Sequence, residues 1–338
     1  MRRLLPFALV ALVFSPLLGD EEAPPSPDEQ PYRPGQMRRF LEIQATNLNW
    51  NMTYLEDDDL LVAGTCDAKL LEETKKLARK TIEKATALLK VDSEEFQGPN
   101  KLHIVYFAKK DEYLAYAKQQ AEATQNPALT KLLETVPASG GMICLDKAYG
   151  VNDAARCHLA VHNLAHQILG GYARHRKGMA AIPGWVREGF PSWMDGVLNT
   201  QPSACCIARV GYDDDQFQRR DQGASWNQTA AAAMRAFRDK KNDPKTGKPA
   251  YTRMGNLMGI KFDKLTGTDV AVSWRLTRDL IAIKQGEPFK AFLDAVLDGG
   301  KQADAFQAAF GKPVDDFETG WMSEVLRSVP ADPPKKKP

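Results

Sequence analysis

The chain has 338 residues, of which 43% are hydrophobic and 26% are charged. This is an ordinary globular composition, and the length allows one large domain or two smaller ones. The formal net charge is only +2, and removing residues 1–19 takes away two of the 45 basic residues, leaving 43 against 43 acidic ones. A near-neutral chain has no broad positive surface for nucleic acid, so nucleic acid is not expected as a partner.

Residues 1–19 have the pattern of a secretory signal peptide. Two arginines precede an apolar run, Leu4–Leu18, that is shorter than the ~20 residues of a membrane-spanning helix. A signal anchor is the alternative, but Pro6 and Pro16 and the shortness of the run argue against it. We therefore expect a secreted or periplasmic protein whose mature chain has no transmembrane span.

Residues 20–36 have the composition of a proline-rich, polar linker, and residues 37–150 are predicted to form the α+β N-terminal part of the domain. Six elements are expected there, in chain order: strands near 38–50 and 59–66, a helix over 67–90 with Asp67 as its N-cap, a strand at 101–108, a helix from Lys110 and a short strand at 140–146. Together they predict a mixed sheet accompanied by helices.

Residues 151–328 are expected to be mainly helical, followed by a lysine- and proline-rich tail at 329–338. The first helix carries the sequence "HLAVHNLAHQ" (158–167), and a loop joins it to a second helix over 185–198. The remaining segments are two polar connectors, 212–228 and 240–250, and four further helices, over 272–283, 288–300, 303–311 and 315–326.

Apolar residues in the first of these helices recur at i, i+3, i+4, i+7, i+8 and i+11, which predicts a stripe that faces the core. The stripe consists of Val161, Leu164, Ala165, Ile168, Leu169 and Tyr172. His162 and His166 are four residues apart along one edge of it, so both imidazoles can reach one point beside the helix. A row of His158, His162 and His166 is an alternative set, but His158 is expected to pack into the core.

Glu188 follows His166 by 22 residues and lies on the second predicted helix. A hairpin of two helices can bring its carboxylate back over the histidines, so that His162, His166 and Glu188 form a His2Glu metal set with a fourth position open. Ser192 and Asp195 lie near the same face as Glu188, and either can hydrogen-bond a ligand imidazole. Metal–ligand distances of ~2 Å require the three ligand atoms to converge to ~3–4 Å of one another.

The segment "HNLAHQIL…IPGWVREGFPSW" resembles the HExxH…WLxEGxAxY pattern of gluzincin metallopeptidases, the thermolysin-like peptidase-MA group. The resemblance is closest to peptidase-MA-like domains of secreted bacterial proteins. It extends from about Phe40 to Leu326, with motif-level support at 158–195 and near 306–321. It implies a zincin-like α+β fold.

By this resemblance, His162, His166 and Glu188 occupy the zinc-ligand positions, and Asn163 occupies the position of the general base. In the active enzymes a glutamate there takes a proton from water. An amide cannot accept that proton, and the loss of a general base typically costs ~10²–10⁴ in rate. Pro191, where the family tends to have alanine, is expected to strain or restart the second helix close to Glu188.

The resemblance and Asn163 together predict a catalytically impaired pseudopeptidase, with a His2Glu zinc site and a peptide or protein as its partner. Two alternatives stay open. The first is an active zinc metallopeptidase with a non-standard base, and the second is a metal-free interaction domain of the cell envelope.

The chain has five cysteines and no CxxC spacing, so neither a cysteine-based zinc site nor a redox motif of that kind is expected. In an exported chain they predict one or two disulfides and at least one thiol left over. They are Cys66, Cys144, Cys157, Cys205 and Cys206.

Overall fold

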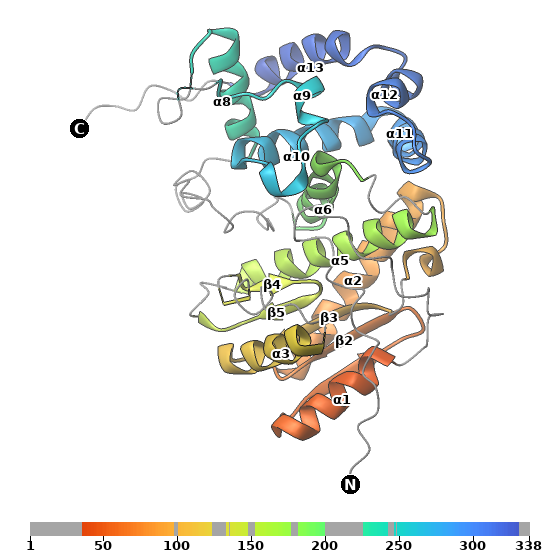
Figure 1. Ribbon diagram of the computed structural model, residues 1–338, viewed down its shortest axis with the longest axis vertical. Helices are drawn as coiled ribbons and strands as arrows, with labels where there is room; N and C mark the ends of the chain where they lie inside the picture. Colours follow the sequence, from red (N-terminus) through yellow and green to blue (C-terminus); the bar gives the residue numbers. More distant parts are fainter. Residues whose placement is uncertain are drawn as a thin grey trace, which may run out of the picture. The chain divides into compact units, whose positions relative to one another are not determined.

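The structure is a computed structural model, and it describes residues 36–97, 101–123, 133–134, 136–147, 153–176, 182–199, 226–242, 247 and 249–330. The predicted signal peptide and almost all of the predicted linker and tail lie outside these residues. The fold is α+β, with a small mixed sheet and mostly helices, as the sequence predicted (Figure 1). Across the described ranges, no helix is both long and apolar enough to span a membrane.

The sheet has five strands in the order β1-β2-β3-β5-β4. β2, β3 and β5 are parallel to one another, whereas β1 and β4 run antiparallel to their neighbours. The three parallel strands are completely buried, which is why they appear in the sequence as apolar runs, with His103 in β3 as the one exception. These three were predicted, and β1 and β4 were not. The bounds are Thr53–Glu56 for β1, Leu60–Gly64 for β2, Leu102–Phe107 for β3, Ala138–Ser139 for β4 and Met142–Cys144 for β5.

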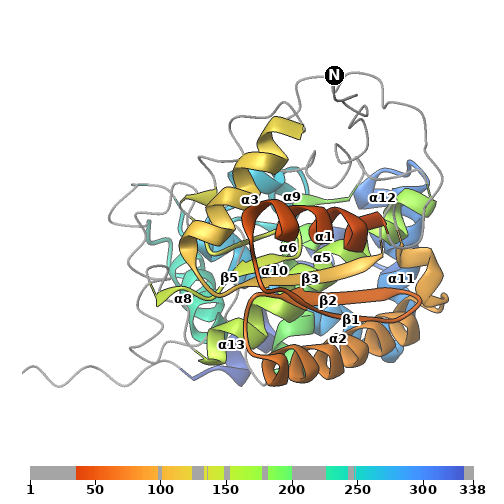
Figure 2. The same cartoon turned by 90° about the horizontal axis from the view of Figure 1, so that it is seen from below.

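Helices cover both faces of the sheet (Figures 1 and 2). On one face lie α1 (Gln36–Leu48) and α3 (Lys110–Ala123), over a buried cluster that includes Phe107. On the other face lie α2 (Ala68–Leu89), packed against β2, and α5 (Asp153–His175), packed against β3 and α2. The helix that carries the two histidines of interest is therefore supported by the sheet.

α2 begins where the sequence predicted. The carboxylate of Asp67 accepts a hydrogen bond from the backbone N–H of Lys69 at 3.1 Å. This bond satisfies one of the N–H groups that have no partner within the first turn of a helix. The predicted N-cap is confirmed.

The predicted strand at 38–50 is wrong, because these residues form α1. Met37, Leu41 and Ala45 are buried at intervals of four residues, which is the helical period. A strand would have placed Ile43 on the same face as Leu41 and Ala45, but Ile43 is exposed. The types of apolar residue suggested a strand, but the spacing of the buried residues is that of a helix.

The chain divides into two compact units. Unit 1 is Met1–His175 with Met194–Arg209, and it contains the sheet and the helices that cover it. Unit 2 is Arg176–Trp193 with Val210–Pro338. Helix α6 (Gly184–Leu198) contributes residues to both.

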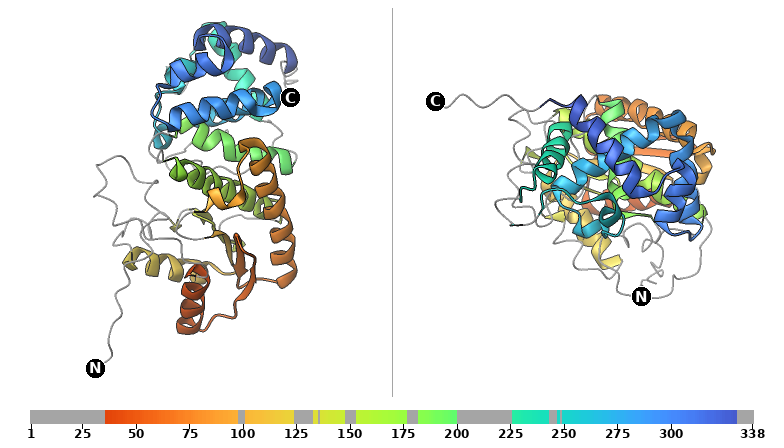
Figure 3. Two further views of the ribbon diagram at one scale, coloured as in Figure 1. Left: turned by 90° about the vertical axis from the view of Figure 1, so that its right-hand side faces the viewer. Right: turned by 90° about the horizontal axis from the view of Figure 1, so that it is seen from above.

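The described part of unit 2 is helical and has no strand apart from a single bridge between Asn242 and Pro249 (Figure 3). The four helices predicted over 272–326 are confirmed as α10 to α13. Besides α6, the helices of this unit are α8 Trp226–Arg238, α9 Met254–Leu257, α10 Gly267–Ala282, α11 Glu287–Leu297, α12 Gln302–Phe310 and α13 Val314–Ser328, with short 3-10 turns η5 Phe262–Lys264 and η6 Ile283–Gly286.

Helix α8 corrects the prediction that residues 212–228 are a connector, since the helix begins at Trp226. Its buried side consists mainly of alanine: Trp226, Ala230, Ala231, Ala233 and Met234. Alanine is only weakly apolar, so this side does not stand out in the sequence as a hydrophobic stripe. Alanine also has the highest helix propensity, and this favours the helix that forms.

The three cysteines that the structure describes are free thiols. Burial raises the pKa of Cys66 and of Cys144 to about 11, so neither is a reactive thiolate near neutral pH. Cys205 and Cys206, the other residues of the predicted disulfides, lie outside the described residues.

Candidate metal centre

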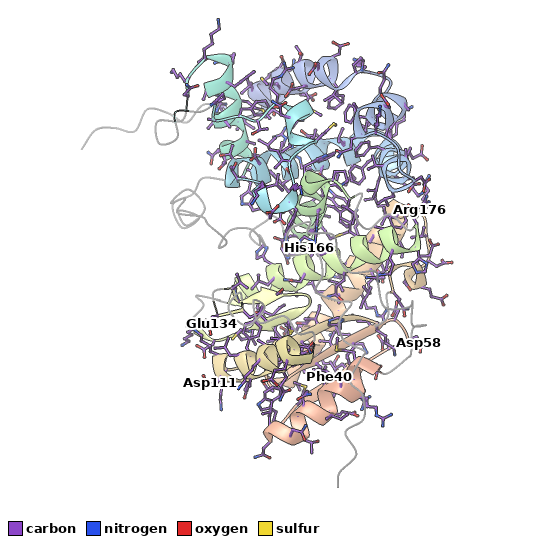
Figure 4. All side chains as sticks on the ribbon, viewed as in Figure 1. Phe40, Asp58, Asp111, Glu134, His166 and Arg176 are labelled. Atoms are coloured by element: carbon purple, nitrogen blue, oxygen red, sulfur yellow. The ribbon has the colours of Figure 1, made fainter. Side chains whose placement is uncertain are left out.

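α5 presents the two histidines as the sequence predicted. All six residues of its apolar stripe are buried, so the stripe faces the core. His162 is 1% exposed and His166 is partly buried. Figure 4 labels His166 on this helix. The edge of a buried stripe is where a helix can hold imidazoles away from bulk water.

The two imidazoles face one point. The Nε2 atoms of His162 and His166 are 3.1 Å apart, and the ring planes are inclined at 73°. Two nitrogens that bind one tetrahedral metal at ~2.0–2.1 Å are roughly 3.3 Å apart. The pair therefore has nearly the separation of two ligands of a single ion.

Glu188 is carried by α6, which runs from Gly184 to Leu198 without a break. Pro191 lies inside this helix, so the expected restart of the helix does not occur. Proline has no N–H for the carbonyl four residues earlier, but that loss affects a single turn. Phe190 and Trp193 beside it are buried, with ring centroids 5.8 Å apart, and this packing holds the turn in place.

Gly189 brings α6 close to α10. A Cβ atom at this position would lie 2.4 Å from Thr277 Oγ1 and 2.7 Å from the carbonyl oxygen of Ser273. Both distances are well below van der Waals contact, so the two helices can approach this closely only at a glycine. The contact fixes the rotation of α6 about its axis, and with it the direction of Glu188, one residue earlier.

His162, His166 and Glu188 each offer one ligand atom, and these atoms all lie within 4.8 Å of one another. The histidine nitrogens meet the expected 3–4 Å, whereas the set as a whole is wider than a loaded site with ~2 Å bonds. Glu188 is completely buried, at 0% exposure, where a carboxylate needs a positive or hydrogen-bonding partner. The three residues form a group that could hold a metal ion once their ligand atoms draw together to the separations that ~2 Å bonds require.

Asn163, at the predicted general-base position, is 4% exposed. Its amide Nδ2 donates a hydrogen bond to the carbonyl oxygen of Leu159 at 2.8 Å, one turn earlier on the same helix. The amide is thus engaged with its own helix backbone, and it has no group that accepts a proton near neutral pH.

Asp195 is completely buried, and its Oδ1 accepts two hydrogen bonds. His158 Nδ1 donates to it at 2.6 Å and Asn199 Nδ2 at 2.9 Å. The expectation that His158 packs into the core is therefore corrected, since its ring pairs with a carboxylate. His158 also does not join the group able to share an ion. Ser192 is completely buried, and its hydroxyl has no hydrogen-bond partner among the described residues.

Gln167, which follows His166, ties α5 to the sheet. Its Nε2 donates to the carbonyl oxygen of His103 at 2.7 Å, and its Oε1 accepts from the backbone N–H of His103 at 3.0 Å. The buried imidazole of His103 lies 3.0 Å from the carbonyl oxygens of both Lys101 and Gly140. Sequence analysis missed both residues, because only the fold brings β3 beside this turn of α5.

His103 is expected to make the protein less stable in mild acid. Desolvation lowers the pKa of its buried ring, although the two carbonyl partners oppose this shift. A histidine with a lowered folded-state pKa contributes its full stability above the unfolded value of ~6.5 and loses it as the pH falls through the folded value. Thermal unfolding at pH 7.5 and pH 5 should therefore show a larger loss for the wild type than for His103→Gln. Equal losses would contradict this role of His103.

No protein-family model, no curated protein and no solved structure matches this chain. The case for a function therefore rests on the residues themselves and on their geometry.

Proposed function

We propose that this chain is an exported, gluzincin-like pseudopeptidase, which binds zinc through His162, His166 and Glu188 and holds a peptide or protein without cleaving it efficiently. The observation that carries the proposal is the convergence of the three ligand atoms to within 4.8 Å, beside an asparagine in the place of the general base. Two imidazoles and one carboxylate with an open fourth position are a usual donor set of catalytic zinc, which favours zinc over other ions.

The loss of efficient catalysis follows from Asn163. Zinc, when bound, supplies Lewis acidity, but the protein must still move a proton from water to the leaving group. Asn163 has no group for this task, and its Nδ2 is bonded to the carbonyl of Leu159. The carboxylate of Asp195 is already the acceptor for His158 and Asn199.

The export and the partner are inferred from the sequence. The arginines and apolar run of residues 1–19 support export. The resemblance to peptidase-MA-like domains supports a peptide or protein as the partner. The balance of acidic and basic residues agrees with a partner other than nucleic acid.

The zinc content of the purified full-length chain tests the proposal. We expect a stoichiometric amount of zinc in the wild type after incubation with zinc and desalting, and almost none in the His162→Ala, His166→Ala double variant, because two of three ligands are lost. His175→Ala is the matched control, since His175 is exposed at the end of the same helix, and it should keep its zinc.

Two results would contradict the proposal. If the wild type and the double variant both contain almost no zinc, the alternative of a metal-free interaction domain is favoured. Efficient, chelator-sensitive cleavage of a generic protein substrate by the wild type would show that the chain is an active peptidase with another base.

A further inference from the structure

One contact between a histidine and a carboxylate joins α5 to α6 near the metal ligands. His158 Nδ1 donates to Asp195 Oδ1 at 2.6 Å, and Asn199, which directly follows the end of α6, donates to the same oxygen at 2.9 Å. Asp195 is completely buried, and the side chain of His158 is 15% exposed. A buried carboxylate is costly unless hydrogen-bond donors surround it. His158 is the donor that α5 supplies.

The contact between His158 and Asp195 lies close to a proposed metal ligand along each of the two helices. His158 precedes His162 by four residues, or about 6 Å of helix, and Asp195 follows Glu188 by seven residues, or about 10.5 Å. Seven residues are almost two full turns, so Asp195 and Glu188 project from nearly the same side of α6. Fixing Asp195 to α5 therefore limits how far α6 can slide or rotate and carry Glu188 away from the histidines.

We propose that His158 and Asp195 are a positioning pair that sets the metal affinity of the group formed by His162, His166 and Glu188. The inference rests on the metal site proposed above. His158 is not itself a ligand, because the group able to share an ion does not include it. It is also no substitute for the missing base, because it lies a full turn beyond His162 and side chains on a helix lean toward its N-terminus, here away from the ligands. Its role is to keep the two ligand-bearing helices in register.

Zinc affinity, measured on the full-length chain by competition with a chromophoric chelator, tests the pair. His158→Ala is expected to weaken zinc binding by about 10-fold, the lower end of the effect seen when a group bonded directly to a ligand is lost, because His158 acts through Asp195 and α6. His158→Asn is expected to restore most of the affinity, because the Nδ2 of asparagine takes the place of the Nδ1 donor. His158→Gln carries its amide at the Nε2 position and is expected to bind as weakly as His158→Ala. His175→Ala should bind like the wild type.

The contrast between asparagine and glutamine separates positioning from packing, because glutamine fills more of the space but places the donor wrongly. Far-UV circular dichroism checks the fold of each variant, and the visible spectrum of the cobalt(II)-loaded protein reports changes in ligand geometry. If His158→Ala does not fold, the comparison of zinc affinity between His158→Asn and His158→Gln tests the positioning pair.

If the wild type binds zinc and the Ala and Gln variants bind it equally well, the positioning pair is overturned while the metal site stands. His158→Asn binding as weakly as His158→Gln would also overturn the pair. If the wild type itself binds no zinc, the proposed metal site fails, and the inference fails with it.

Discussion

Replacing Asn163 by glutamate is expected to raise chelator-sensitive cleavage of an unfolded protein substrate about 10²-fold or more, the size of a general-base contribution. By the resemblance to gluzincins, a glutamate at position 163 occupies the place of the general base. The three proposed ligand atoms lie within 4.8 Å of one another. The measurement is the rate of release of a fluorophore from labelled casein with zinc present, with and without chelator.

Two controls separate this gain from other causes. Asn163→Gln has the length of the glutamate variant without its proton-accepting oxygen, so it should stay as inactive as the wild type. Asn163→Glu combined with His166→Ala should lose the gain, because the metal is lost. Breaking the bond from Asn163 to the carbonyl of Leu159 should cost no more than ~1 kcal/mol of stability, which thermal unfolding can measure. A glutamate variant that holds zinc and stays inactive would show that the site is not a disabled peptidase site.

The histidine helix could be predicted from the sequence because its signals are local. Six apolar residues repeat with the helical period, and the four-residue spacing of His162 and His166 follows from the same period. The structure buries all six and places the two Nε2 atoms 3.1 Å apart. Both features depend only on residues within a few turns of one helix, so the sequence was sufficient to predict them.

The supporting contacts of the site could not be predicted, because they join residues far apart in the chain. His158 and Asp195 are separated by 37 residues, and His103 and Gln167 by 64. Nothing in either local sequence indicates its partner. The same holds for Gly189, whose importance appears only where α6 meets the backbone of α10.

Two elements were mispredicted for opposite reasons. At α1 the residue types favoured a strand, and the helical spacing of Met37, Leu41 and Ala45 was the better guide. At α8 the buried side is mostly alanine, so hydrophobicity gave too little signal. Both helices form because one face is buried against the rest of the protein. This packing contributes more to their stability than the weak or mixed preferences of the local sequence.

Replacing Gly171 by alanine is expected to destabilise the protein by about 3 kcal/mol or more, at or above the upper end of the usual cost of overpacking. A Cβ at Gly171 would lie 1.8 Å from the carbonyl oxygen and 2.4 Å from the carbonyl carbon of Phe96, in the 3-10 turn η1 (Ser93–Phe96). These are backbone atoms, so no change of side-chain conformation can relieve the clash. Phe96 is buried, so a movement of η1 that relieves the clash draws its side chain out of the core and costs stability. The measurement is urea unfolding followed by far-UV circular dichroism.

The sign of the effect makes this a sharp test. Glycine inside a helix is ordinarily worse than alanine by about 0.5–1 kcal/mol, so the same substitution without a clash should stabilise the protein. Gly320 in α13 supplies that control, because a Cβ there meets nothing within 4 Å. We expect Gly320→Ala to unfold at higher urea than the wild type and Gly171→Ala at lower urea. An unchanged or higher midpoint for Gly171→Ala would contradict the described packing of α5 on η1.

Gly171→Ala should also affect the metal site, because Gly171 follows His166 by five residues on the same helix. The clash with Phe96 can be relieved only by moving α5 or η1. If α5 moves, both imidazoles move with it and zinc affinity falls together with stability. If η1 moves, stability falls and zinc affinity stays near that of the wild type. The bonds from Gln167 to the backbone of β3 hold α5 on the sheet beside His166, so we expect η1 to yield and the folded variant to keep its zinc.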